Sequence, residues 1–126
     1  MSEHHVDVAD TAAAMGSGDV ACLGTPRLLA WFEAATCELA QALLDEGQTT
    51  VGTGVELEHL APSAVGSTVT IDANVRERTE GWLDYDVMAT DPATGRLLAR
   101  GTITRAIVDR KDFVARMRRH SVPSGP

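Results

Sequence analysis

The chain has 126 residues, of which 44% are apolar and 23% charged, and this is the size and composition of one globular domain with its own core. A net charge of −7 argues against a nucleic-acid partner, and no apolar run approaches the roughly 20 residues that cross a bilayer, so no membrane partner is expected. The opening residues lack the pattern of a secretion signal and the two cysteines fit no metal spacing, so we expect a cytoplasmic location and reduced thiols.

The N-terminal part of the chain predicts a short strand, a connection and one long helix. Alternating valines favour a strand over residues 4–9, and the small residues of 11–24 indicate an irregular or partly helical link. Thr25 is a suitable N-cap with Pro26 at the first helical position, so we expect a helix over 25–44 that a following glycine stops. The buried stripe predicted for this helix consists of Leu28, Phe32, Ala35, Leu39 and Leu43.

Downstream of that helix, a period of two in the apolar residues marks four strands, at 51–61, 68–79, 83–89 and 97–107. Gly81 and Gly95 suit tight turns between the later strands, and Asp109 is a suitable N-cap for a short last helix. In the first of these strands, the residues predicted to face the core are Val51, Thr53, Val55, Leu57 and His59.

This order of elements predicts an α+β fold in which one antiparallel sheet wraps around a single long central helix. We expect the four strands to run as a meander in chain order, because they follow one another without intervening helices. A single domain is expected over residues 1–120, and residues 121–126 are expected to form a flexible tail. Long edge strands in so small a domain favour pairing with a second copy, so we expect a homodimer.

Three ionisable side chains interrupt the apolar faces of these elements. Glu33 lies among apolar residues of the helix, His59 lies on the first long strand, and Arg105 lies between isoleucines on the last. A lone histidine on such a face is more often a satisfied core residue, but a cluster of buried ionisable groups marks a site. A carboxylate can activate water or attack directly, and a histidine can orient it or protonate a leaving group. With the Thr25 hydroxyl and the close backbone approach allowed at Gly52, these groups suit acyl-transfer hydrolysis.

The spacing along the helix limits this hypothesis. Thr25 and Glu33 are eight residues apart in the sequence, which is about 12 Å along a regular helix. Three explanations are open: the helix begins after Thr25, the substrate bridges the two residues, or a second subunit completes the site.

Four motifs carry a resemblance to a known family. They are the helix 25–44 with its glutamate, Val51-Gly-Thr-Gly-Val55, His59 followed by Ala61-Pro62 and Gly66, and Gly101-Thr-Ile-Thr-Arg105-Ala. With these motifs the chain resembles the hotdog-fold acyl-CoA thioesterases, and among them the fluoroacetyl-CoA thioesterase type, from residue 25 to about residue 108. The resemblance implies a catalytic set of Thr25, Glu33 and His59. It also implies that Gly52 and Arg105 bind the substrate, and that no metal or cofactor is needed besides the CoA of the substrate.

The resemblance implies hydrolysis of an acyl-CoA thioester to the free acid and CoA. In that enzyme type aromatic residues before the helix gate the pocket, whereas residues 11–24 here are rich in Ala and Gly. Selectivity for a fluorinated acyl group is therefore not expected, and a general short-chain acyl-CoA or another thioester fits equally well. The candidate ligands of the CoA phosphates are Arg76, Arg78, Arg96, Arg100, Arg110 and Lys111. Two alternatives are a non-catalytic acyl-CoA-binding or sensing hotdog domain and, less favoured, a hotdog hydratase, whose closely spaced Asp and His are absent here.

Overall fold

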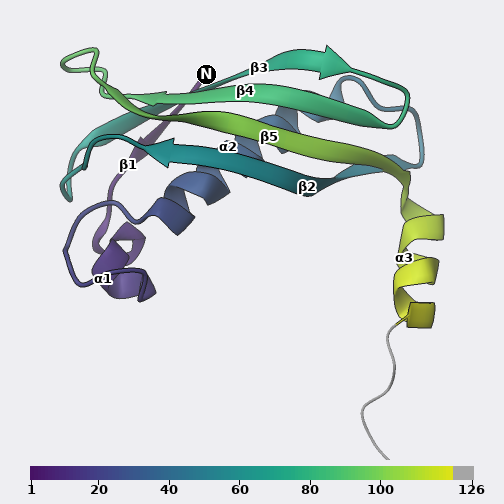
Figure 1. The fold of residues 1–126 in the computed structure, drawn as a ribbon, viewed down its shortest axis with the longest axis horizontal. Coiled ribbons are helices and arrows are strands. Elements are labelled where there is room, and N and C mark those ends of the chain that lie inside the picture. The colour runs from purple at the N-terminus through teal and green to yellow at the C-terminus, as the bar shows by residue number, and fades with distance from the viewer. Residues whose placement is uncertain (121–126) are drawn as a thin grey trace, which may run out of the picture.

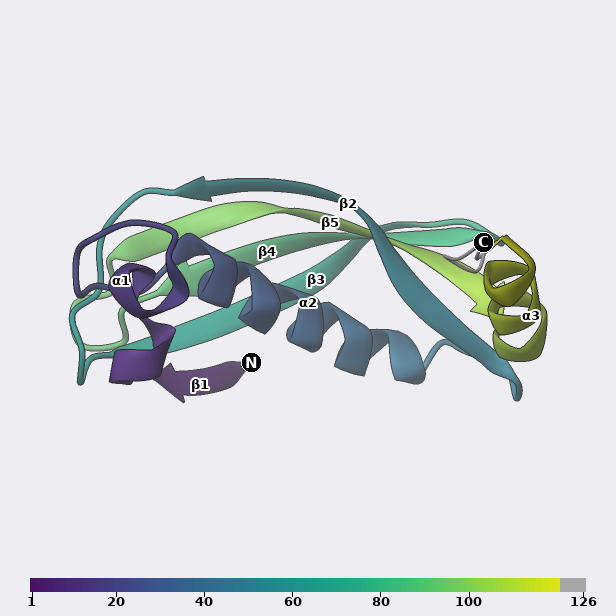
Figure 2. The ribbon, with the colours of Figure 1, turned by 90° about the horizontal axis from the view of Figure 1, so that it is seen from below.

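The computed structural model describes residues 1–120, in which a curled antiparallel sheet wraps around one long helix (Figures 1 and 2). The strands are β1 (Ser2–His5), β2 (Gln48–His59), β3 (Thr68–Arg78), β4 (Trp82–Thr90) and β5 (Leu97–Asp109). The helices are the short 3₁₀ helix η1 (Val8–Asp10), α1 (Ala12–Met15), the central α2 (Thr25–Gln41) and α3 (Arg110–His120). The predicted α+β architecture is confirmed, whereas the tail predicted at 121–126 lies outside the described residues.

The strands do not lie in chain order across the sheet, which runs β1-β3-β4-β5-β2. β3, β4 and β5 form a meander as predicted, but β2 pairs with β5, so the predicted four-strand meander is wrong for β2. The eight residues between β2 and β3 allow this arrangement, because they can span about 26 Å whereas crossing over two strands requires about 14 Å. β1 and β2 are therefore the two edges of the sheet.

The N-terminal strand is shorter than predicted. β1 ends at His5, because the Asp7 amide donates a hydrogen bond of 2.9 Å to the Asp10 carboxylate and η1 begins there. The predicted strand over 4–9 is therefore wrong in its second half. The link over 11–24 contains α1 and is partly helical, as predicted.

A bulge in β2 changes which of its residues face the helix. The register with β5 shifts between Gly52 and Gly54, so that Thr53 is an extra residue in the strand. Before the bulge, Thr50 is buried at 8% exposure, whereas the sequence predicts Val51 as the inner residue. Beyond the bulge Leu57 and His59 are partly buried as predicted, whereas Val55, also predicted to face the core, is 44% exposed. The prediction of one continuous inner face is wrong because a single extra residue reverses the alternation.

Helix α2 also differs from its prediction at both ends and along its buried row. It begins at Thr25 with Gly24 as the N-cap, so the prediction of Thr25 as the N-cap is wrong, and it ends at Gln41 rather than at residue 44. Its buried residues are Leu28, Phe32, Thr36 and Ala40. The predicted stripe is wrong at Leu39, which is 45% exposed. The buried residues of α2 follow one another at intervals of four. The predicted stripe instead advances by three residues from Phe32 to Ala35, and so leaves the buried face.

The core fills the space between α2 and the inner face of the sheet. The residues predicted to point inward from β4 are all buried: Leu83, Tyr85, Val87 and Ala89. β5 adds Ala99, Ile103 and the side chain of Arg105 on the same face. The predicted turn at Gly95 is confirmed by its φ of 73°, and the predicted cap of α3 by the Asp109 carboxylate, which accepts a hydrogen bond of 3.0 Å from the third residue of the helix.

Candidate active site

The first residue of α2 and the last residue of β2 form one polar pair. Thr25 Oγ1 and His59 Nδ1 share a hydrogen bond of 2.8 Å. The Thr25 hydroxyl is available for this bond because it does not cap the helix. Burial lowers the pKa of His59 from its ordinary value of 6.5, and a hydrogen bond with the backbone of Ala61 partly opposes this effect. The ring is therefore neutral at pH 7, the form that accepts a proton.

A cavity of about 350 Å³ adjoins this pair. Its other lining residues come from the segment before α2 and from the segment after β2: Ala12, Ser17, Cys22, Leu23, Leu60, Ala61 and Pro62. In Figure 2, α1 lies beside the start of α2, so the segment before α2 covers that end of the sheet. All of these residues lack aromatic rings, so the wall of the cavity is made of small and aliphatic side chains.

A second polar pair lies further along α2. Glu33 Oε2 is 3.7 Å from Arg105 Nη1, and the arginine is buried at 6% exposure while the glutamate side chain is 43% exposed. Gly52 lies opposite Arg105 in the register of β2 and β5. A Cβ atom at Gly52 would lie 2.8 Å from Glu33 Oε2, a distance that side-chain carbons do not adopt. The missing side chain at this position therefore gives access to the carboxylate from the sheet.

The structure thus brings the five predicted site residues together as two groups on the inner side of the sheet. Thr25 is the first residue of an unbroken helix that also carries Glu33, so the explanation that the helix begins after Thr25 is wrong. Within the described residues, no hydrogen bond or ion pair joins Glu33 to Thr25 or His59. A bridging substrate and a second subunit are the two explanations that are left.

Sequence reasoning missed Thr50. Its hydroxyl accepts a hydrogen bond of 2.9 Å from Arg105 Nε, and its carbonyl oxygen accepts one of 3.4 Å from Nη2. The predicted strand begins at Val51 and so does not include Thr50, and its alternation, without the bulge, leaves no reason to place Thr50 on the inner face. The two glycines that flank Thr53 were the available signal, since glycine inside a strand often marks a bulge.

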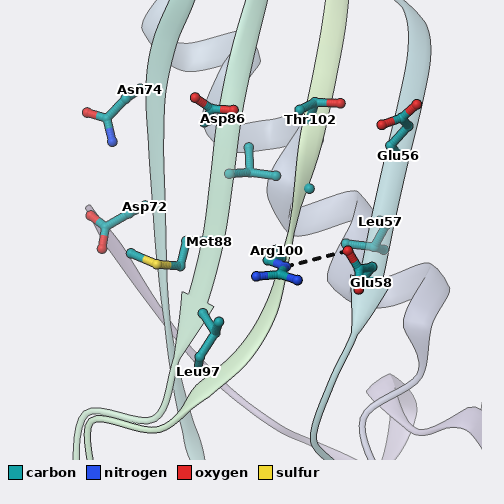
Figure 3. Close-up of a pocket in the computed structure, with 12 residues that line it drawn as sticks. Glu56, Leu57, Glu58, Asp72, Asn74, Asp86, Met88, Leu97, Arg100 and Thr102 are labelled. Carbon is teal, nitrogen blue, oxygen red and sulfur yellow. Dashed lines mark ion pairs between the residues drawn. The ribbon is translucent and has the colours of Figure 1, made fainter.

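A separate hollow lies on the outer face of the sheet (Figure 3). It has a volume of about 530 Å³. Its polar residues include the carboxylates of Glu56, Glu58, Asp72 and Asp86. Arg100 is its one basic residue and lies 3.5 Å from Glu58. Four carboxylates around one arginine repel anions, so this hollow does not suit the phosphates of CoA, and none of the predicted site residues lines it.

Residues 1–120 lack the features of two further classes of site. No group of three or more His, Cys, Asp or Glu side chains is arranged there to hold a metal ion. In the same residues, no helix is long and apolar enough to cross a membrane.

An antiparallel sheet wrapped around one long helix is the hotdog fold. Residues 6–111 match the family model described as fluoroacetyl-CoA-specific thioesterase, and the chain belongs to this family of acyl-CoA thioesterases. No curated protein sequence matches the chain significantly.

Solved structures support the fold. A point mutant of the fluoroacetyl-CoA-specific thioesterase FlK, in complex with fluoroacetate and CoA, is 22% identical with a TM-score of 0.86 over 96% of this chain and 98% of that one. A hot-dog-like protein from Thermanaerovibrio acidaminovorans is 23% identical with a TM-score of 0.86, over 97% and 90% of the two chains. A thioesterase superfamily member from Thermus thermophilus is 24% identical, also with a TM-score of 0.86, over 94% and 86%. At these identities the likeness establishes the hotdog fold and no more.

Proposed function

We propose that the chain hydrolyses a short-chain acyl-CoA thioester to the free acid and CoA, with Thr25, Glu33 and His59 as the catalytic set. The observation that carries this proposal is the Glu33 carboxylate, which lies beside the buried Arg105 and over Gly52. Membership of the thioesterase family supports it. FlK has been crystallised with fluoroacetate and CoA and with acetyl-CoA, and all of these acyl groups are small.

In the proposed reaction the Glu33 carboxylate either attacks the acyl carbon or takes a proton from the water that does so. In either case a new C–O bond replaces the C–S bond, and the CoA sulfur leaves as a thiolate that takes up a proton released by water. Where Glu33 itself attacks, the product of this step is a mixed anhydride, which water then hydrolyses to the free acid and the regenerated carboxylate. His59 and Thr25 serve the proton transfer to that sulfur, because their hydrogen bond keeps the ring oriented. A carboxylate and a histidine suffice for this chemistry, so we propose that it uses no resident metal or cofactor.

The short-chain preference rests on the small acyl groups crystallised with FlK. The cavity beside Thr25 and His59 is lined by Ala12, Cys22 and other small or aliphatic residues, which suit an apolar acyl group. Nothing in this lining is specific for fluorine. We therefore place acetyl-CoA and similar short thioesters first in the substrate panel.

We further propose that the CoA phosphates bind at the α3 end of the molecule. α3 carries five basic residues against one acidic residue, and none of the five forms an ion pair within residues 1–120. Arg110 lies five residues beyond Arg105 in the sequence, or about 17 Å along an extended strand, and the pantetheine arm of CoA separates its phosphates from its sulfur. The candidate Arg100 is disfavoured because it lies among carboxylates on the outer face.

The decisive test is thiol release from a panel of acyl-CoA thioesters by the wild type and by Glu33→Ala. We expect the variant to lose roughly a hundredfold or more in kcat, the usual range for removal of a general base. Glu38→Ala, which changes an exposed carboxylate on the same helix, is the matched control and should keep wild-type turnover. Undiminished turnover in Glu33→Ala would contradict the assigned role. Tight binding of acyl-CoA by a wild type that hydrolyses no panel member would indicate the non-catalytic alternative.

A further inference from the structure

The guanidinium of Arg105 is a buried charge whose orientation needs an explanation. The side chain lies on the inner face of β5 between Ile103 and Ile107 and is only 6% exposed. A buried charge is stable only where neighbouring groups replace its hydration. The carboxylate of Glu33 is 3.7 Å away, beyond hydrogen-bond distance, and so does not hold the guanidinium by itself.

Thr50 supplies the missing anchor. Arg105 Nε donates to Thr50 Oγ1 at 2.9 Å, and Arg105 Nη2 donates to the Thr50 carbonyl oxygen at 3.4 Å. One residue therefore engages two of the three guanidinium nitrogens. Because the guanidinium is planar and rigid, fixing Nε and Nη2 also fixes the direction of the third nitrogen.

That third nitrogen, Nη1, points into the site. It is buried, has no hydrogen-bond acceptor within the described residues, and is the atom that lies closest to Glu33 Oε2. It also lies 3.6 Å from the point that a Cβ of Gly52 would occupy. An unpaired buried donor is unfavourable by about 1–3 kcal/mol, which is understandable if its acceptor is an oxygen of the substrate.

The bulge in β2 is what gives Thr50 this role. Thr50 lies two residues before Gly52, which is opposite Arg105, so the three residues share the inner face upstream of the bulge. Without the extra residue Thr53, a strand with His59 on its inner face would place Thr50 on the outer face. The same irregularity thus brings Gly52 under Glu33 and Thr50 beside Arg105.

We propose that Thr50 is a positioning residue of the thioesterase site, which acts through Arg105 by directing Nη1 toward Glu33 and the acyl oxygen. This rests on the proposed function. The purely structural alternative is that Thr50 only ties β2 to β5, in which case its loss would affect stability and leave the chemistry of the folded enzyme unchanged.

The first test compares Thr50→Val, which removes the hydroxyl but keeps the shape, with Thr50→Ser, which keeps the hydroxyl. We expect kcat to fall about tenfold in Thr50→Val with KM changed less than twofold, and Thr50→Ser to retain most of the wild-type kcat. Thr70→Val removes a hydroxyl of similar burial on β3 that has no contact with the site, and should keep wild-type kinetics. Folding of each variant is checked by its thermal midpoint. A wild-type kcat in folded Thr50→Val would overturn the proposal.

The second test is a double-mutant cycle with Arg105→Lys. If Thr50 acts through the guanidinium, Thr50→Val should change kcat by less than twofold in the Arg105→Lys background, although it changes the wild type about tenfold. Additive effects would overturn the proposal, because they would mean that Thr50 acts independently of Arg105.

A measurement that needs no turnover separates this proposal from the proposed function. In the wild type and in Thr50→Ser, the Arg105 Nε–H should give an NMR signal protected from exchange with water, and in Thr50→Val this protection should be lost. Protection that is unchanged in Thr50→Val would overturn the anchoring role. A wild type with this protection but with no hydrolysis of any acyl-CoA would instead overturn the proposed function alone.

Discussion

Gly52 is the residue at which the geometry of the site is tightest. Gly52→Ala would place a methyl group 2.8 Å from Glu33 Oε2, so the carboxylate must move and we expect kcat/KM to fall at least tenfold. Gly54→Ala is the matched control in the same bulge, since its methyl group would make only ordinary contacts of 3.6 Å with Thr104. Kinetics of both variants on one acyl-CoA check the prediction. Equal losses in the two would mean that the bulge, rather than access to Glu33, requires glycine.

The burial of His59 couples stability to pH. Because burial lowers the folded-state pKa below the ordinary value of 6.5, the unfolded chain binds the proton more readily. The part of the free energy of unfolding that depends on a neutral His59 is at its full value above pH 6.5. It decreases as the pH falls from that value toward the folded-state pKa. His4 contributes in the same direction, also through burial. We expect the thermal midpoint of His59→Gln to fall less between pH 7 and pH 5 than that of the wild type, and parallel profiles would contradict this.

Sequence alone locates the chemical groups of the site better than their contacts. The residue types at Glu33, His59 and Arg105 stand out because charge on an apolar face needs a partner. Their partners were not predictable, since Thr50 belongs to the inner face only through the bulge at Thr53. Thr25 shows the same limit: its preference for an N-cap is a local property, and the tertiary hydrogen bond with His59 prevails over it.

At the scale of elements, local patterns predicted what each segment becomes, and long-range pairing decided where it lies. The alternation in β4 and β5 and the turn residues between them act over a few positions, so these elements form as expected. The position of β2 beside β5 depends on where the segment 60–67 leads the chain, and the predicted meander fails there. Nothing in the periodicity of β2 distinguishes pairing with β3 from pairing with β5.

Helix α3 is the element whose role is easiest to isolate, because it extends from the end of β5 away from the sheet (Figure 1). If it binds the CoA phosphates, the double variant Arg116→Glu and Arg119→Glu should raise KM for acyl-CoA by about tenfold or more, through the loss of two charge contacts of roughly 1 kcal/mol each. The KM for the matching N-acetylcysteamine thioester, which has no phosphates, should not change.

The control for α3 is Arg96→Glu, which reverses one charge in the turn before β5, at the other end of that strand. It should leave both KM values near those of the wild type. An equal rise for the thioester without phosphates would contradict a role in phosphate binding, and so would an equal effect of Arg96→Glu.

At the scale of the whole molecule, the separation of the two polar groups has a consequence for assembly. Glu33 and Thr25 share one helix, yet within residues 1–120 no hydrogen bond or ion pair joins Glu33 to the Thr25–His59 pair. β2 is a 12-residue edge strand with unpaired backbone groups along one side, which favours pairing with a second copy. We therefore propose a homodimer in which Glu33 of one subunit works with the Thr25–His59 pair of the other.

Mixing of inactive variants tests this shared site. Equal amounts of Glu33→Ala and His59→Ala subunits that exchange freely give about half heterodimers, and each has one intact site out of two, so about a quarter of the wild-type activity should return. Thr25→Ala mixed with His59→Ala should recover nothing, because these two residues form one pair within a single subunit. If no activity returns in a mixture that native mass spectrometry shows to contain heterodimers, then each set is complete within one chain and the substrate itself must bridge Glu33 and His59.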